Sequence, residues 1–280
     1  MKVFTTKEAL KTHLNSPSLC AKQIGFVPTM GALHEGHLSL LRECKKNNSI
    51  SVVSIFVNPI QFDKKDDLEK YPRTLLNDLR LLENEGCDVV FIPSVDEMYS
   101  KNSSTLQFDF DSLEDVMEGA FRSGHFNGVG TVVKLLFEMI NPTRAYFGEK
   151  DFQQLLIIRK MVEKHQLPVQ IIGCSIFRED NGLAMSSRNE RLSKSAKQEA
   201  ALIYRILTAV REMTTNHSLE DIHQWVCLQF KDHPLFFLEY FIIANERTLQ
   251  TATIIDPKIY YRAFIAVKVG SVRLIDNIAL

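Results

Sequence analysis

Residues 50–58 read ISVVSIFVN, an almost unbroken run of β-branched and other apolar residues. Such a run is typical of a strand that is covered on both faces. Residues 22–30 (KQIGFVPTM) and 88–93 (DVVFIP) predict two further short, buried strands. Between these strands, apolar residues at helical spacing predict one helix from about residue 36 and another that stops at Gly86.

The same alternation continues along the chain. The sequence predicts helices over residues 129–140 and 151–165, and strands over 145–148 and 169–176. Strands that alternate with helices predict an α/β fold with a Rossmann-like, doubly wound, mostly parallel sheet. Right-handed crossovers in such a sheet place the ligand at the carboxyl ends of the strands. We therefore expect the functional site in the loops that directly follow strands.

The pattern changes after about residue 190. Apolar spacing predicts one long amphipathic helix over residues 196–210 and a second helix that is capped by Ser218. Shorter strand-like runs follow, over residues 236–244, 263–269 and 272–275. This part of the chain predicts a smaller α+β unit, so we expect two domains, 1–175 and 176–280.

Composition excludes several classes of protein. The chain has 280 residues, with 33 Lys and Arg against 34 Asp and Glu, and a formal net charge of -1. This balance argues against a nucleic-acid-binding protein, which needs a basic surface. No apolar run approaches the ~18–20 residues of a membrane span, and the first residues lack the apolar core of a signal peptide. The 5 cysteines are widely spaced without a CxxC pair, so we expect a reducing compartment and a cytoplasmic protein.

The first candidate site comes directly after a predicted strand, where residues 28–37 read PTMGALHEGH. Gly31 and Gly36 allow the backbone to approach a ligand closely, and the start of the following helix offers N–H groups to a phosphate. His34 and His37 lie one helical turn apart, and their imidazoles could stabilise charge that builds on a phosphate. The alternative is a pair of surface histidines near a helix start. A zinc site is a weaker alternative, because a lone HxxH lacks further ligands.

The second and third candidate segments carry amides and a histidine. Asn58 and Gln61 follow the second strand, and their amides suit a substrate with hydroxyl and carboxylate groups. An ordinary Asn-Pro turn is the alternative there. Residues 122–129 (RSGHFNGV) include His125 and predict a loop before a helix, either at an active site or without a function.

The remaining two segments carry groups that suit phosphates. Residues 147–154 (FGEKDFQQ) place Lys150 at a helix start, where its charge opposes the helix dipole and so favours a role with an anion. Asp151 beside it is also explained as a helix cap. Residues 178–189 (REDNGLAMSSRN) combine hydroxyls with arginine, which suits polyphosphate oxygens, although a Ser-rich surface turn would have the same composition.

These segments carry a resemblance to a known family. Residues 34–37 (HEGH) resemble the HxGH signature of the nucleotidylyl-transferase superfamily, and the longer PTMGALHEGH resembles the pantoate–β-alanine ligase family. The other segments, and a closing stretch over residues 262–277, agree with that family in the same order across nearly the whole chain. The chain departs from the family pattern at Ser123, Phe177 and Asn181, where the family usually has Pro, a smaller aliphatic residue and Asp.

The resemblance implies the ATP-dependent condensation of D-pantoate with β-alanine to pantothenate, through a pantoyl adenylate, with release of AMP and pyrophosphate. It implies ATP as a substrate, Mg²⁺, and a homodimer without nucleic-acid or membrane partners. Residues 1–175 would bind the nucleotide and pantoate, and residues 176–280 would form a lid that carries the MSSR loop. A related nucleotidyltransferase and a catalytically silent paralogue are the alternatives.

Carried over residue by residue, the resemblance implies catalytic roles for four residues, namely His34, His37, Lys150 and Arg188. It implies an ATP site formed by Met30, Gly31, Ala32, Leu33, His34, Glu35, Gly36, His37, Gly148, Glu149, Lys150, Asp151, Phe177, Met185, Ser186, Ser187 and Arg188. For pantoate and β-alanine we expect Asn58, Gln61, His125 and Gln154. Asp78 is a candidate magnesium ligand, with a solvated helix carboxylate as the alternative.

Overall fold

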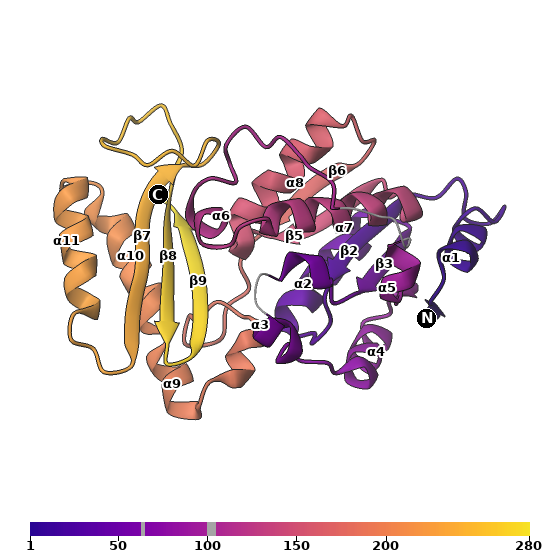
Figure 1. Cartoon of the computed structure of the whole chain (residues 1–280), viewed down its shortest axis with the longest axis horizontal. Helices are drawn as coiled ribbons and strands as arrows, with labels where there is room; N and C mark the ends of the chain where they lie inside the picture. The colour runs from indigo at the N-terminus through magenta and orange to yellow at the C-terminus, as the bar shows by residue number, and fades with distance from the viewer. Residues whose placement is uncertain (63–64, 100–104) are drawn as a thin grey trace. The chain divides into compact units, whose positions relative to one another are not determined.

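A computed structural model describes residues 1–62, 65–99 and 105–280 of the chain (Figure 1). The chain forms two compact units. The first consists of residues 1–149 and 153–175, and the second of residues 150–152 and 176–280. The short segment 150–152 therefore groups with the second unit, although the sequence predicts a division at residue 175. No helix within the described residues combines the length and the apolar composition needed to cross a membrane.

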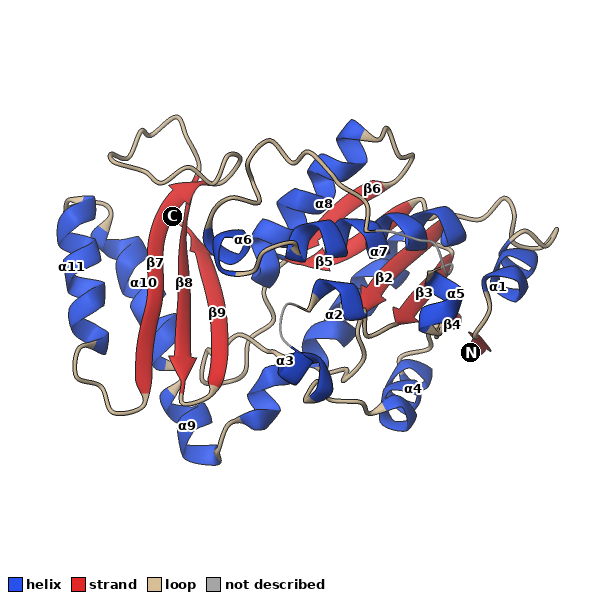
Figure 2. Cartoon of the chain, in the orientation of Figure 1, coloured by secondary structure: helices blue, strands red, loops and turns tan. Residues whose placement is uncertain are grey.

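A parallel sheet forms the centre of the first unit (Figures 1 and 2). Its strands in the described ranges are β1 (Lys2–Phe4), β2 (Ile24–Thr29), β3 (Ile50–Ile55), β4 (Val89–Phe91), β5 (Arg144–Gly148) and β6 (Gln170–Cys174). They lie in the order β1-β4-β3-β2-β5-β6, and every neighbouring pair is parallel. The predicted α/β fold with a Rossmann-like parallel sheet is confirmed.

Helices lie on both faces of this sheet because successive strand residues point to opposite sides. In β2, the ring of Phe26 meets Phe137 at 6.2 Å, whereas Val27 belongs to the apolar cluster that includes Leu41. The helices of this unit are α1 (Lys7–Leu14), α2 (Glu35–Asn47), α3 (Lys65–Glu69), α4 (Leu75–Asn84), α5 (Val95–Met98), α6 (Met117–Phe121), α7 (His125–Ile140) and α8 (Phe152–Lys164). Short 3-10 turns, η1 (Pro59–Gln61) and η2 (Glu149–Asp151), follow β3 and β5.

The strand order identifies the ligand-binding edge. From β2 the chain moves outward through β3 and β4, and then returns to the other side of β2 with β5. A parallel α/β sheet binds its ligand where the strand order reverses in this way, outside the carboxyl ends of the two strands. Residues 30–34 follow β2, and Gly148 ends β5 with Glu149 directly after it, so the fold places two predicted ATP-binding segments at this point.

The second unit contains an antiparallel sheet in the order β7-β8-β9. Its strands are β7 (Phe236–Asn245), β8 (Tyr261–Val269) and β9 (Val272–Ala279). Gly270 and Ser271 join β8 to β9, as predicted. The apolar residues of this sheet pack with two amphipathic helices, α10 (Leu202–Met213) and α11 (Leu219–Phe230). A 3-10 turn, η3 (Ser187–Arg191), and the short helix α9 (Lys194–Glu199) come before them.

Several element boundaries differ from those predicted. The helix expected over residues 196–210 is two helices, because the chain tightens at the Ala200-Ala201 step, where Ile203 N–H bonds Ala200 O. Apolar spacing continues across that turn and hides the break. Helix α7 begins at His125, so the segment predicted as a loop supplies its first turn. Strand β9 ends at Ala279, beyond the predicted end at residue 275. The prediction followed apolar residues and therefore missed the last part of the strand, which begins with two buried polar residues, Asp276 and Asn277.

Candidate active site

Asp78, in the first turn of α4, binds the backbone of the turn that follows β2. Its Oδ2 accepts a hydrogen bond from Ala32 N at 3.0 Å, and its Oδ1 accepts bonds from Leu33 N and Thr74 Oγ1, both at 2.9 Å. Gly31 has φ +81°, and a Cβ atom there would lie only 3.1 Å from Asp78 Oδ2. The carboxylate and the glycine together fix the path of the backbone that leads into α2.

Only one of the two sequence-based interpretations of Asp78 is excluded, and its role as a magnesium ligand stays a prediction. Asp78 is 1 % exposed, so it is not a solvated helix carboxylate. Both carboxylate oxygens are engaged by neighbouring donors of the chain, which is the environment of a residue that shapes a loop. Within residues 1–62, 65–99 and 105–280, no group of three or more His, Cys, Asp or Glu side chains is arranged to hold a metal ion.

His34 and His37 form the start of α2. His34 is the N-cap, and its Nδ1 accepts a hydrogen bond from Gly36 N at 3.1 Å. His37 Nδ1 accepts one from His34 N at 3.4 Å. An imidazole that accepts at Nδ1 carries its proton on Nε2. The two rings, 4.1 Å apart, are thus set to act as Nε2–H donors beside the positive end of a helix.

Gln61 lies beside this turn, because its Nε2 contacts Met30 Sδ at 3.0 Å. Its Oε1 accepts a hydrogen bond from Asn58 Nδ2 at 3.1 Å. Asn58 is 1 % exposed, and it also donates to Gly128 O and accepts from Tyr99 Oη at 2.7 Å. The side-chain amide of Asn58 thus holds Gln61 in place. The structure brings Met30, Gln61 and Asn58 together, with Gln61 between the other two.

His125, in the first turn of α7, also supports Gln61. Its Nδ1 lies 2.8 Å from Gln61 O, and its Nε2 lies 3.1 Å from Arg122 Nη1. Arginine can only donate, so Nε2 accepts and the proton of this buried imidazole lies on Nδ1, where it bonds Gln61 O. The absence of a side chain at Gly128 permits this contact, because a Cβ atom there would lie 2.7 Å from Ile60 O.

Gln153 and Gln154 are adjacent in α8 but lie in different surroundings. Gln153 is 4 % exposed, donates to Leu113 O and Val116 O at 2.7 and 2.8 Å, and accepts from Glu118 N at 3.0 Å. It fixes the segment before α6. Gln154 is half-buried, and its role as a pantoate ligand stays a prediction.

Two segments of the second unit carry the remaining candidates. Lys150 and Asp151 form an ion pair, with Nζ 3.3 Å from Oδ1, in the turn η2. In the segment from Phe177 to Arg188, Ser186 accepts a hydrogen bond from Arg188 N, and Ser187 is 8 % exposed. Met185 N bonds Phe177 O at 3.0 Å, so Phe177 and Met185 lie side by side at the ends of a closed turn.

Sequence reasoning did not find the residues that hold these two segments. Arg178 forms a two-pronged ion pair with Asp276, and Asn277 donates from Nδ2 to Lys150 O at 2.9 Å. The available signal was the position of Asp276 and Asn277 in a strand whose other buried residues are apolar. Tyr99 and Gln153 carried no comparable signal, because their partners are distant in sequence.

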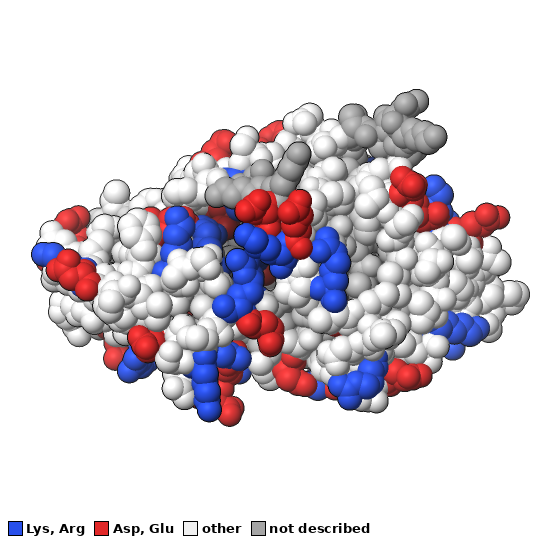
Figure 3. Space-filling view, turned by 60° about the horizontal axis from the view of Figure 1, so that its bottom comes forward, with Lys and Arg blue, Asp and Glu red and all other residues white. Residues whose placement is uncertain are grey.

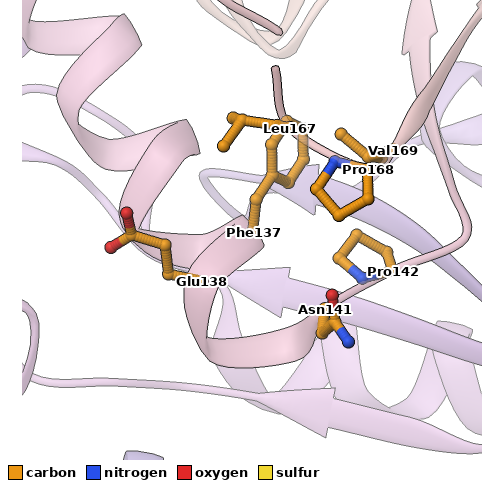
Figure 4. A pocket seen from close by; sticks show the side chains of 7 residues that line it. All are labelled: Phe137, Glu138, Asn141, Pro142, Leu167, Pro168 and Val169. Carbon is orange, nitrogen blue, oxygen red and sulfur yellow. The ribbon is translucent and has the colours of Figure 1, made fainter. Parts of the chain in front are cut away.

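An apolar pocket is lined by Phe137, Glu138, Asn141, Pro142, Leu167, Pro168 and Val169 (Figure 4). Its loops precede β5 and β6, so it lies at the amino ends of these strands, opposite to the predicted edge. On the face shown in Figure 3, basic and acidic side chains lie next to one another, as the balanced composition predicts.

The chain is similar to known proteins along its whole length. Residues 2–279 match the family model described as pantoate-beta-alanine ligase. The pantothenate synthetase of Christiangramia forsetii is 54 % identical over 281 residues, covering 100 % of this chain and 99 % of that protein. The pantothenate synthetase of Bacteroides thetaiotaomicron is 48 % identical, covering 99 % of this chain and 98 % of that protein.

Solved structures give the same result. The pantothenate synthetase of Thermus thermophilus superposes with a TM-score of 0.92 at 39 % identity, and 99 % of each chain is covered. The pantoate-beta-alanine ligase of Francisella tularensis, solved in complex with beta-gamma ATP and β-alanine, has a TM-score of 0.82 at 34 % identity, covering 100 % of this chain and 97 % of that chain. With the motifs in place on the same fold along its whole length, the chain belongs to the pantoate–β-alanine ligase family.

Proposed function

We propose that this protein condenses D-pantoate with β-alanine to give pantothenate, using ATP and releasing AMP and pyrophosphate. The observation that carries the proposal is the histidine pair of α2, in a chain that matches the ligase family over residues 2–279. Both imidazoles accept at Nδ1 and so present Nε2–H donors at a helix start. Donors of this kind suit an α-phosphate on which negative charge builds up.

In the first step the pantoate carboxylate attacks the α-phosphate of ATP, forming the mixed anhydride bond while the bond to pyrophosphate breaks. The nucleophile is already an anion, so this step needs positioning and charge stabilisation rather than a general base. We assign His34 and His37 to the α-phosphate oxygens, with His37 as the residue that would supply a proton if one is needed. Lys150 and Arg188 would neutralise phosphate charge, and the hydroxyls of Ser186 and Ser187 would donate to phosphate oxygens.

The other candidate ATP residues would bind through the backbone or by packing. The turn over residues 30–36, shaped by Asp78, would let the nucleotide approach its main chain closely. We assign the same kind of contact to Gly148, Glu149 and Asp151. Phe177 and Met185, which are joined by a backbone hydrogen bond, would line the adenine pocket.

We assign the pantoate site to Gln61 and Gln154. Each amide offers a donor and an acceptor, which suits a molecule with hydroxyls and a carboxylate. Asn58 and His125 act through Gln61, because one bonds its side-chain oxygen and the other its backbone carbonyl. In the second step the β-alanine amine attacks the acyl carbon, loses a proton and displaces AMP. The acyl adenylate must be shielded from water, and the assignment of residues 176–280 as a lid stays a prediction.

We further infer that Mg²⁺ reaches the protein on the phosphates of ATP, as is common for this ion. The engaged oxygens of Asp78 support this inference, and no step above depends on a protein-bound metal. The 5 cysteines are free thiols, which supports a cytoplasmic location. The family resemblance supports a homodimer, which light scattering coupled to size exclusion would test.

The decisive experiment measures pyrophosphate and AMP release from ATP with magnesium and D-pantoate, with and without β-alanine. We expect pyrophosphate release to require pantoate, and AMP and pantothenate to appear only with β-alanine. Accumulation of a stable adenylylated product would instead support the related nucleotidyltransferase. A folded protein without pantoate-dependent turnover would support the silent paralogue and direct attention to Ser123, Phe177 and Asn181.

A further inference from the structure

We propose that Asp276 and Asn277, neighbours in β9, are positioning residues that hold residues 150–152 and 178–188 in the arrangement needed to bind the phosphates of ATP. This inference rests on the proposed function, because it takes Lys150 and Arg188 as phosphate ligands. Neither Asp276 nor Asn277 is assigned a contact with substrate. Both act through the segments that they hold.

Asp276 anchors the segment that leads to Arg188. Its Oδ2 and Oδ1 accept hydrogen bonds from Arg178 Nη1 and Nη2 at 2.7 and 3.0 Å, in the two-pronged geometry that fixes both planes. The same guanidinium lies 3.8 Å from the ring centre of Tyr204 and donates to Gly182 O at 3.0 Å. Arg178 is thereby held on three sides, and it closes the turn before Met185.

Asn277 anchors the segment that carries Lys150. Its Nδ2 donates to Lys150 O at 2.9 Å, and its Oδ1 accepts from Arg262 Nη1 at 2.6 Å. Arg262 stacks on the ring of Phe152, 4.0 Å from its centre. The segment over residues 150–152 is therefore held at two points. Asn277 bonds its main chain at Lys150, and Arg262 packs on the side chain of Phe152.

The two anchors are coupled. Asn277 N donates to Asp276 Oδ1 at 2.8 Å. Asn277 therefore fixes the Asp276 carboxylate, which in turn binds Arg178. Asp276 and Asn277 are 4 % and 2 % exposed. Such a buried ion pair is weak grounds for stability, because well-packed apolar residues often replace it without loss. A positioning role explains why buried polar residues stand at these two places in β9, one on each face of the strand.

Two variants separate positioning from stability. The double variant Arg178→Met with Asp276→Leu removes both charges together, so it should fold, whereas a single change would leave a buried charge. Asn277→Asp keeps the shape and the bond from Arg262, but it removes the donor to Lys150 O. Glu239→Gln is the matched control, because Glu239 forms ion pairs with Arg273 and Lys268 on the same sheet.

The readouts are ATP binding by calorimetry in the presence of magnesium, the rate of pyrophosphate release, and the melting temperature. We expect both test variants to bind ATP about 10-fold more weakly and to release pyrophosphate about 100-fold more slowly, since a small displacement of binding groups has effects of this size. Their KM for pantoate should stay within about twofold, because Gln61 is held by Asn58 and His125, which lie outside these segments. Glu239→Gln should keep wild-type activity.

The outcomes distinguish the two proposals. Folded test variants that bind ATP and turn over like the wild type would overturn the positioning role, as would losses that simply follow the melting temperature across all variants, including the control. A wild-type protein that binds ATP without pantoate-dependent turnover would overturn the proposed reaction only, and weaker ATP binding in the variants would then still support positioning. Should the double variant not fold, Asn277→Asp decides.

Discussion

The imidazole rings of His34 and His37 lie 4.1 Å apart, and each accepts a backbone hydrogen bond through Nδ1. The two histidines thus cap the N-terminus of α2 together, a position where Ser, Thr, Asp or Asn is usual. One ring nitrogen serves the fold, while the other is left with the proton that chemistry would use. In the proposed reaction, stability and catalysis would therefore depend on different atoms of the same side chain.

Substitution of His34 can separate these two functions. His34→Asn keeps a good N-cap but removes the Nε2–H donor, whereas His34→Ala removes both. We expect pyrophosphate release to fall at least about 100-fold in both variants. Only His34→Ala should lower the free energy of unfolding, by about 1 kcal/mol. Urea denaturation and the release assay measure these effects, and near-wild-type turnover by His34→Asn would mean that the residue only caps the helix.

Gln153 and Gln154 offer a comparison between neighbours. Gln153→Ala removes the hydrogen bonds that its amide makes to Leu113 O, Val116 O and Glu118 N, so we expect it to lower the free energy of unfolding by about 2–3 kcal/mol. Gln154→Ala should leave stability within about 0.5 kcal/mol but raise the KM for pantoate about tenfold. Steady-state kinetics and chemical denaturation test the pair, and a stable Gln154→Ala with wild-type KM would remove Gln154 from the pantoate site.

Asp78→Asn tests whether this carboxylate shapes the loop or binds magnesium. The amide keeps one acceptor and turns its NH₂ group toward a backbone N–H, so we expect a loss of about 2 kcal/mol in stability. Activity should fall with it, because the turn over residues 30–34 loses its support. A magnesium titration should give the wild-type midpoint. A midpoint that moves about tenfold to higher concentration would show a ligand role instead.

The sequence predicts the parallel sheet well because its signal is local. A buried strand such as β3 is an apolar run, and a helix such as α2 has a period of its own. The motifs at the strand ends are local in the same sense. By contrast, the break between α9 and α10 is invisible to periodicity, since both helices bury apolar faces in one core.

The roles of individual polar residues depend on partners that are distant in sequence. Nothing near Asp78 in the sequence indicates that its oxygens meet the backbone at Ala32 and Leu33. Only the family resemblance distinguishes Gln154 from Gln153 in the sequence, and the reason why their surroundings differ appears once the segment before α6 is placed against α8. Local sequence identifies which residues are polar and where strands end, whereas the fold decides which of these residues face a substrate and which hold another residue.

The thiols give a prediction that depends on pH. Burial raises the pKa of Cys44 to about 12, and those of Cys87 and Cys174 to about 11. At pH 8 a thiol with a pKa of about 11 is ionised to about one part in a thousand. We expect Ellman's reagent to modify two thiols rapidly in the native protein, the exposed Cys20 and Cys227, and all 5 in guanidinium.

The same raised pKa values make the protonated thiols stabilising relative to the unfolded chain, where the value is 9.0. Their contribution is complete below pH 9.0 and is lost as the pH rises toward about 11. The melting temperature should therefore fall over this range, and less steeply in a Cys87→Ala variant. Rapid reaction of five native thiols at pH 8 would contradict the assigned burial.

Tyr99 and Tyr146 allow a matched test of how Gln61 is positioned. Each hydroxyl forms a 2.7 Å hydrogen bond with an asparagine, Tyr99 with Asn58 and Tyr146 with Asn48. Either Tyr→Phe change should lower stability by about 1 kcal/mol. Only Asn58 continues to Gln61, so only Tyr99→Phe should loosen the predicted pantoate ligand. We expect the KM of Tyr99→Phe for pantoate to rise about fivefold at nearly unchanged kcat. The reason is that Asn58, without the bond from Tyr99, would hold Gln61 in its binding orientation for a smaller fraction of the time. Tyr146→Phe should keep the wild-type KM, and equal values for the two variants would show that Asn58 does not position Gln61.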